Sequence, residues 1–225
     1  MLFRSYFVNI ENNAYHIWQL ELLIESFKHN AIENSLFVGI ARSTDFFMPF
    51  SCDNVTNHKR TFAYENIGKL RGYDKLNDMY SLLWSQQYNY AAQPLVVLSP
   101  DMVLRTPIEY TFKNDRPEVI FTPNPQFTFD FALKNVGNFY EWFDKEKSFY
   151  QENWIPYGSL ALFNKIPNEV FLKAALIAEE LALYQLLNKQ NIWKNTDKLA
   201  WSICLQDLCK DIEDRKSTRL NSSHV

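Results

Sequence analysis

Short apolar runs alternate with amphipathic segments along the first half of the chain, and this alternation limits the folds that the sequence can adopt. The runs at 2–10, 36–41 and 94–98 have the length and apolar content of strands. Between them, residues 15–28 and 74–88 repeat apolar side chains at intervals of three and four, which is typical of amphipathic helices. Strands that alternate with helices form a mostly parallel sheet flanked by those helices. The pattern therefore predicts an α/β fold.

The second half of the chain continues the pattern with more helix. In chain order, the predicted elements are a strand at 119–122, an aromatic-rich helical stretch at about 129–151, a strand at 157–163, and helices at 167–188 and 196–212. Residues 46–70 carry little periodicity and are predicted to form a loop with short pieces of structure. Because no repeat or Gly/Ser-rich linker divides the chain, we expect a single domain.

The composition favours a soluble globular protein. A chain of 225 residues, of which 47% are hydrophobic, can bury one sizeable core. No stretch reaches the roughly 18 uninterrupted apolar residues of a membrane helix, and the N-terminus lacks the pattern of a secretory leader. The 3 cysteines have no metal-binding spacing, and their odd number argues against a disulfide framework. We expect a cytoplasmic protein that does not contact a membrane.

The last residues, 215–225, differ in character from the rest of the chain. They resemble translated adapter sequence, so the predicted domain spans residues 1–214 and is expected to be incomplete at its C-terminus. This tail holds three basic residues and no acidic residue, so the formal net charge of −3 becomes −6 without it. A negative balance disfavours a broad nucleic-acid-binding surface.

The carboxyl end of the predicted strand at 94–98 carries the strongest candidate for chemistry. Ligands of open α/β sheets bind beyond the carboxyl ends of the strands, and this strand ends at Ser99, Pro100 and Asp101. A carboxylate in this position can hold a divalent cation, which neutralises a diphosphate and supports it as a leaving group. The alternative for Asp101 is a turn aspartate that accepts hydrogen bonds from backbone amides.

Three segments of the chain are similar, in the same order, to a known family. Residues 95–108 (LVVLSPDMVLRTPI) resemble its D-P-D-M segment and the R-x-P-I/F that follows, and residues 15–28 (YHIWQLELLIESFK) resemble its W-Q-x-x-x-L-x-x-S-F helix. Residues 73–76 (YDKL) lie where the family has an Asn-Lys-Pro helix start. The family is the hydroxyproline O-arabinosyltransferase and peptidyl-serine galactosyltransferase group. The resemblance implies a GT-A (Rossmann-like) fold, a UDP-sugar donor and a Mn²⁺ or Mg²⁺ cofactor.

The resemblance also implies how the nucleotide is bound. Backbone groups of Phe7, Val8 and Asn9 would contact the uracil. Arg42, after the second predicted strand, would contact the nucleotide or the diphosphate, and Lys75 would place a positive charge near the phosphates. The alternative for both basic residues is a solvated position on the surface.

Two departures from the family pattern bear on the metal. Ser99 replaces the first acid of the D-x-D pattern, which leaves Asp101 as its anionic ligand and Ser99 as a hydrogen-bonding group for the ribose or a metal-bound water. Many enzymes of this kind complete the metal site with a late histidine, but the last histidine before the tail is His58. We therefore expect a low metal affinity and a missing third ligand.

Two segments of the second half resemble substrate-contacting parts of such enzymes. Residues 154–159 (WIPYGS) resemble the glycine-containing strand that meets the sugar or the acceptor, so Gly158 is a candidate contact. Residues 196–201 (TDKLAW) resemble a helix start at which an acid faces the transferred sugar, so Asp197 is the candidate catalytic residue. The alternative for Asp197 is an acid in the first turn that interacts with the helix dipole.

The implied function is transfer of a pentose or hexose from a UDP-sugar to a hydroxyl group of a peptide, a glycan or a modified nucleobase. Two alternatives stay open. One is a viral enzyme that glycosylates a DNA base, which the acidic balance of the chain disfavours. The other is a non-catalytic module that binds nucleotide sugars, which Ser99 and the missing C-terminal segment favour.

Overall fold

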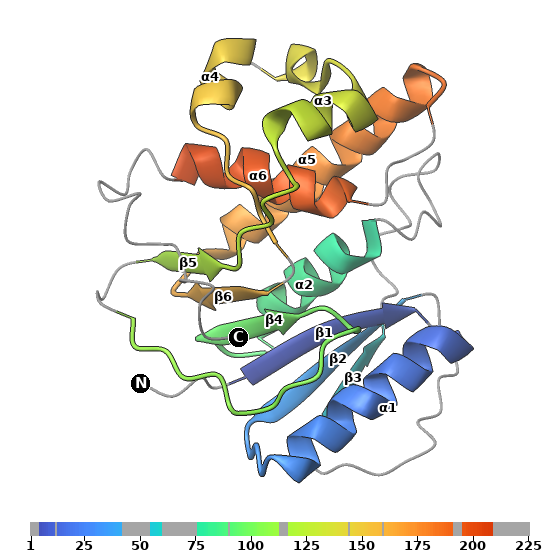
Figure 1. The fold of residues 1–225 in the computed structure, drawn as a ribbon, viewed down its shortest axis with the longest axis vertical. Coiled ribbons are helices and arrows are strands. Elements are labelled where there is room, and N and C mark those ends of the chain that lie inside the picture. The colour runs from blue at the N-terminus through green and yellow to red at the C-terminus, as the bar shows by residue number, and fades with distance from the viewer. Residues whose placement is uncertain are drawn as a thin grey trace.

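A six-stranded sheet runs through the middle of the protein in the computed structural model (Figure 1). Its strands are β1 (Ser5–Glu11), β2 (Ser35–Ala41), β3 (Val55–Lys59), β4 (Leu95–Leu98), β5 (Glu118–Phe121) and β6 (Ala161–Asn164). The helices are α1 (Ala14–His29), α2 (Asn77–Gln87), α3 (Phe129–Val136), α4 (Lys147–Glu152), α5 (Asn168–Leu187) and α6 (Thr196–Leu208), with a 3-10 helix, η2 (Phe139–Trp142), between α3 and α4. The structure describes residues 5–11, 13–41, 55–59, 76–89, 91–112, 117–143, 145–158, 160–190 and 195–208. The predicted α/β class is confirmed.

The sheet is mixed, so the prediction of a mostly parallel sheet is only partly correct. The strand order is β3-β2-β1-β4-β6-β5. β1 pairs in parallel with both β2 and β4, and β2 pairs in parallel with β3, whereas β6 runs antiparallel to β4 and to β5. The chain travels from β5 to β6 through α3, η2 and α4, which lie away from the sheet (Figure 1). Because this connection is not a crossover helix packed on a face of the sheet, β6 can run antiparallel to its neighbours β4 and β5.

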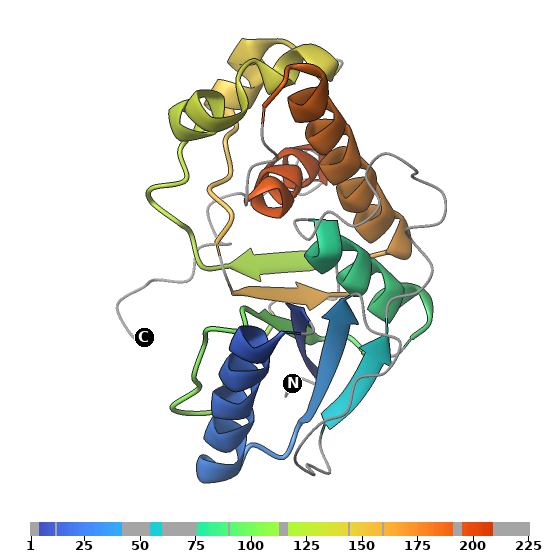
Figure 2. The ribbon, with the colours of Figure 1, turned by 90° about the vertical axis from the view of Figure 1, so that its right-hand side faces the viewer.

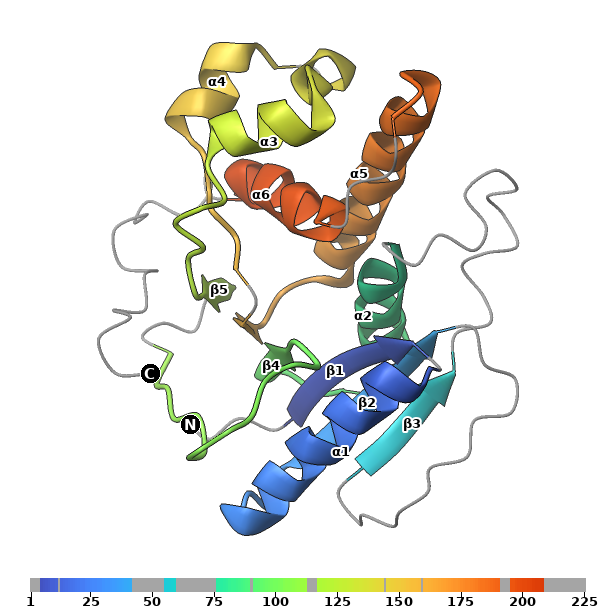
Figure 3. The ribbon, with the colours of Figure 1, turned by 45° about the vertical axis from the view of Figure 1, so that its right-hand side comes forward.

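Helices cover both faces of the sheet (Figure 2). On one face, Leu20 and Leu23 of α1 pack in a buried cluster with Tyr6 and Val8 of β1. On the other face, Phe7 belongs to a larger buried cluster with side chains of α2, α5 and α6 (Figure 3). Successive residues of a strand point to opposite faces, so β1 contributes to both clusters and lies at the centre of the molecule.

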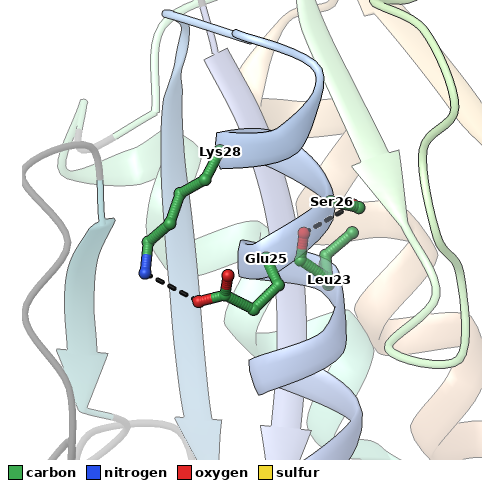
Figure 4. A network of polar contacts seen from close by, with 4 residues as sticks. All are labelled: Leu23, Glu25, Ser26 and Lys28. Carbon is green, nitrogen blue, oxygen red and sulfur yellow. Dashed lines mark hydrogen bonds and ion pairs between the residues drawn. The ribbon is translucent and has the colours of Figure 1, made fainter.

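Helix α1 begins at a side-chain cap and carries a polar side chain within its buried face. The side chain of Asn13 caps its N-terminus by accepting a hydrogen bond from the backbone of the first turn. Near the other end, the Ser26 hydroxyl donates to the Leu23 carbonyl oxygen at 2.6 Å, while Lys28 and Glu25 form a 2.7 Å ion pair on the exposed side (Figure 4). The exposed pair adds little stability, so burial of the apolar side chains holds α1 on the sheet.

Helix α2 approaches β2 closely because Gly39 has no side chain. A Cβ atom placed on Gly39 would lie 1.8 Å from Oγ of Ser81. Glycine therefore allows α2 to settle on the sheet at this point. The contact helps to hold the first turn of α2 beside the carboxyl end of β1.

Two predicted elements differ from the structure, and a third region contains a strand. The stretch at 46–70 was predicted as a loop with short pieces of structure, and within it strand β3 pairs in parallel with β2. The helical stretch at 129–151 is divided into α3, η2 and α4, because Gly137 ends α3 with a positive φ of 80°. The strand predicted at 157–163 begins only at Ala161, and the residues before it are irregular. Helix α6 begins at Thr196, as predicted, and residues 209–225, including the predicted tail, lie outside the described residues.

Candidate functional site

The strand order places a crevice at the carboxyl ends of β1 and β4. From β1 the chain moves outward to β2 and β3, then returns to form β4 on the opposite side of β1. The connection through α1 covers one face of the sheet, and α2, in the connection that returns to β4, covers the other (Figure 2). Where successive connections diverge in this way, the two strand ends leave a space between them, and open α/β sheets bind ligands there.

A cavity of about 200 Å³ occupies this crevice. Its polar lining comes from Asn9 at the end of β1, Asp78 in the first turn of α2, Ser99 after β4, and Asn195, Asp197 and Lys198 at the start of α6. The apolar part of the wall includes Phe7, Tyr157 and Trp201. Four remote segments of the sequence therefore contribute polar groups to one cavity.

Five of the residues predicted from sequence line this cavity together. They are Phe7, Asn9, Ser99, Gly158 and Asp197. The first two come from β1 and Ser99 from the end of β4, whereas the last two lie more than fifty residues further along the chain. Asn9 and Ser99 meet because the carboxyl ends of parallel strands lie at one edge of a sheet. Gly158 joins them because β6 runs antiparallel to β4, so the start of β6 lies at the same edge.

Of the other four predicted residues, Val8 and Asp101 are not among those that line the cavity. Val8 faces the cluster under α1, and its backbone lies between Val38 of β2 and Leu98 of β4 in the sheet. Asp101 is exposed and lies in a turn in which the Met102 amide donates to the Ser99 carbonyl oxygen at 3.1 Å. The two predicted basic ligands, Arg42 and Lys75, fall outside the described residues.

Metal binding was predicted at Asp101, and none of the described residues joins it in a group of three or more metal ligands. Within the described ranges, no group of three or more His, Cys, Asp or Glu side chains is arranged to hold a metal ion. Asp101 is exposed to solvent and does not line the cavity. A Mn²⁺ or Mg²⁺ ion requires several oxygen ligands, so the described residues do not fit a resident metal at this position.

Asp78 is the functional candidate that the sequence patterns missed. The side-chain amide of Asn9 donates a hydrogen bond of 2.5 Å from Nδ2 to Oδ1 of Asp78. Asp78 is exposed at the mouth of the cavity, so the contact joins the end of β1 to the first turn of α2 beside open solvent. An acid in the first turn is common in helices because it interacts favourably with the helix dipole, so the position of Asp78 along the chain does not indicate a site.

The carboxyl group of Asp197 has the most perturbed environment in the cavity. The residue as a whole is half-buried, but its carboxyl group is surrounded by protein. Burial is the largest cause that raises the pKa of Asp197 to about 7, and the negative charge of Asp78 raises it further. Lys198 and the backbone amides of Asp197 and Lys198 oppose this effect by stabilising the carboxylate. Asp197 therefore changes protonation state near neutral pH.

Tyr157 and Trp201 form the aromatic wall beside these carboxyl groups. Their rings stack with centroids 5.9 Å apart and planes inclined by 18°. Burial raises the pKa of the Tyr157 hydroxyl, and the charges of Asp197 and Asp78 add to this effect, so Tyr157 stays protonated. A protonated phenol donates a hydrogen bond, so this hydroxyl can serve as a donor to a ligand in the cavity.

Gly158 is required at its position by packing against a neighbouring segment. A Cβ atom added to Gly158 would lie 1.7 Å from the backbone carbonyl oxygen of Thr122. The backbone of residue 158 therefore runs in close contact with the segment that follows β5, and the cavity is lined here by main chain. This observation explains the glycine structurally and is also compatible with a ligand lying against the backbone.

Comparison with known proteins assigns no family to this geometry. The sequence matches no protein-family model and no curated protein. In the described part of the chain, no helix has the length and apolar character needed to cross a membrane. Function is therefore inferred from the cavity together with the sequence patterns.

Proposed function

We propose that the protein is a GT-A-type glycosyltransferase that transfers a pentose or hexose from a UDP-sugar to a hydroxyl group. The observation that carries the proposal is the cavity at the carboxyl ends of β1 and β4, which Asn9, Ser99 and Asp197 line together. Each of these three residues was predicted from a different segment of the sequence. A nucleotide-binding site at the point where the strand order reverses is the arrangement expected for an open α/β sheet.

The nucleotide would lie against the ends of the two central strands. Phe7 supplies a buried aromatic surface, and Asn9 presents an amide that hydrogen-bonds to polar groups at the edge of a base. Ser99, half-buried after β4, offers a hydroxyl that both donates to and accepts from a ribose. Val8 stays part of the fold in this proposal, because its side chain is fully buried under α1.

The diphosphate would lie toward the start of α6. Lys198 lines the cavity there, and the N-terminus of a helix attracts negative charge through its unpaired backbone amides. A Mn²⁺ or Mg²⁺ ion held by Asp101 belongs to the function implied by the resemblance. Since the described residues do not build a metal site around that carboxylate, no step is assigned to an ion.

Asp197 is the proposed catalytic residue. A carboxyl group with a pKa of about 7 is populated in both protonation states at neutral pH, which suits a group that accepts a proton from an attacking hydroxyl. Its carboxyl oxygens can also accept hydrogen bonds from the hydroxyl groups of a bound sugar. The Tyr157 hydroxyl, on the same wall, donates to an oxygen of the sugar.

A second function is favoured by one observation, namely that Ser99 rather than an acid lines the cavity at the end of β4. Loss of this carboxylate fits a module that binds nucleotide sugars without turning them over. A panel of UDP-pentoses and UDP-hexoses, incubated with the protein with and without Mn²⁺, distinguishes the two functions through the release of UDP.

The proposed enzyme releases UDP from at least one donor, by transfer or by slow hydrolysis. Asp197→Asn should then lower the rate by about 10² to 10⁴ while UDP still binds. Asp130→Asn, which changes an exposed acid in the first turn of α3, is the matched control and should leave the rate unchanged. Binding of UDP without release from any donor would favour the non-catalytic module instead.

A further inference from the structure

The contact between Asn9 and Asp78 links two walls of the cavity that come from different layers of the fold. Asn9 lies at the carboxyl end of β1 in the sheet, and Asp78 lies in the first turn of α2 on the face opposite α1. Their 2.5 Å hydrogen bond fixes the direction of the Asn9 amide, since the donating Nδ2 is held by the carboxylate. The amide oxygen of Asn9 therefore lies on the opposite side of the amide group from Nδ2, where it can accept a hydrogen bond.

Asp78 also acts on Asp197 through its negative charge, which raises the pKa of Asp197, whereas Lys198 acts in the opposite direction. Among the described lining residues, the titratable groups that face Asp197 are Asp78 from α2, Tyr157 from the segment before β6, and Lys198 from α6 itself. From the described part of the sheet, Asn9 of β1 and Ser99 after β4 add uncharged polar groups. Among the described lining residues, one positive charge, that of Lys198, therefore lies near two carboxyl groups.

We propose that Asp78 is a positioning residue of the cavity: its carboxylate orients the Asn9 amide, and it shares the cavity with the carboxyl group of Asp197, on which its negative charge acts. For catalysis this inference rests on the proposed function, in which Asp197 is the reacting carboxyl group. The hydrogen bond and the electrostatic effect themselves are properties of the unliganded protein. Asp78 would thus act on two groups at once. It orients Asn9, which is proposed to bind the base, and it affects the protonation of Asp197, which is proposed to bind the sugar.

The substitution Asp78→Asn separates charge from contact. An asparagine oxygen still accepts a hydrogen bond from Asn9, so the contact is retained while the negative charge is lost. The carboxyl group of Asp197 should then ionise more easily, with its titration midpoint lowered on the order of one pH unit. The substitution Asn9→Ala does the reverse, because it removes the donor and leaves the charge. In Asn9→Ala the titration midpoint of Asp197 should stay near its wild-type value.

The measurement is a pH titration of the side-chain carboxyl carbons by ¹³C NMR, with the whole chain labelled at aspartate and no ligand added. The Asp197 signal is assigned by its loss in Asp197→Asn. Asp130→Asn, remote from the cavity, is the control for the loss of an acid from the first turn of a helix, and circular dichroism checks that each variant is folded.

A lowered Asp197 midpoint in Asp78→Asn, together with an unchanged midpoint in Asn9→Ala and in Asp130→Asn, supports the inference. An unchanged Asp197 midpoint in Asp78→Asn overturns the inference. An equal fall of the Asp197 midpoint in Asn9→Ala also overturns it, because the shift would then come from a disturbed contact and not from the lost charge. Because no nucleotide is present, these outcomes are separate from the test of UDP-sugar turnover. The inference can fail while the proposed function holds, and the reverse is also true.

Discussion

The ring of Tyr157 stacks on the ring of Trp201 at a centroid distance of 5.9 Å. Tyr157 comes from the segment before β6 and Trp201 from α6, so the stacked pair packs α6 against the segment that leads into the sheet beside the cavity. Trp201 also packs against Phe163 and Phe171, at 5.1 and 5.8 Å between ring centroids. A single indole therefore joins the wall of the site to the larger buried cluster.

Trp201→Ala should destabilise the protein strongly, because it removes a large buried side chain that touches several rings. Substitutions of this kind lower the free energy of unfolding by about 3–5 kcal/mol. Urea denaturation followed by circular dichroism measures the loss. Trp18→Ala is the matched control: Trp18 is 54% exposed on α1, and its loss should change stability by less than about 1 kcal/mol. Similar losses in the two variants would contradict the assigned role of Trp201.

Gly158→Ala should destabilise the protein more than Gly39→Ala. The added methyl group at 158 meets the backbone carbonyl of Thr122, which cannot move without shifting the chain, and overpacking of this kind lowers stability by about 1–3 kcal/mol. At 39 the nearest atom is Oγ of Ser81, which can rotate away. Thermal and urea unfolding of both variants provide the comparison. A larger loss in Gly39→Ala would show that the segments around 122 and 158 can separate.

The ionisation of Asp197 should make the folded state less stable as the pH rises from about 4 to about 7. Its pKa in the folded protein is about 7, above the unfolded value of about 3.9, so the folded state binds more protons in this window and stability falls with pH. Asp197→Asn removes this contribution, so its free energy of unfolding should fall less than that of the wild type between pH 5 and 8. Parallel pH profiles for the two proteins would contradict the raised pKa.

Glu179 provides a control for pH effects that lie away from the cavity. Burial on α5, followed by the charge of Glu180, raises the pKa of Glu179 to about 7, and this residue does not line the cavity. Glu179→Gln should therefore also reduce the fall in stability between pH 5 and 8, for the same reason. It should leave UDP binding unchanged, whereas Asp197→Asn alters the pH dependence of that binding. Isothermal titration calorimetry at both pH values separates the two variants.

Several parts of the fold could be predicted from the sequence because they follow from periodicity. The spacing of apolar residues identified α1, α5, the strand that contains Asn9 and the strand that precedes Ser99, and the ends of those strands identified the edge at which the cavity lies. Strand β3 was not located within the stretch at 46–70, because its five residues, VTNHK, are mostly polar and carry no alternating apolar pattern. The direction of β6 could not be predicted, since an apolar run looks the same in either direction.

The site was predicted less completely than the fold, and Ser99 and Asp101 illustrate why. Both lie in one turn, and the sequence does not show which side chain the turn directs toward the crevice. In the structure Ser99 lines the cavity and Asp101 is exposed. Asp78 was missed for a different reason: it meets Asn9 only because α2 packs beside β1, a contact between residues separated by 69 positions. Tertiary packing, which periodicity does not encode, creates this part of the site.

Binding of UDP in the cavity is the central claim, and an NMR titration of the ¹⁵N-labelled protein with UDP tests it most directly. We expect saturable shift changes that centre on the backbone amides of Asn9, Ser99 and Gly158, with a smaller set at the start of α6. The amides of the exposed C-terminal end of α5, around Leu187, should not move. Saturable changes around Leu187 alone, or no saturable change anywhere, would contradict the account.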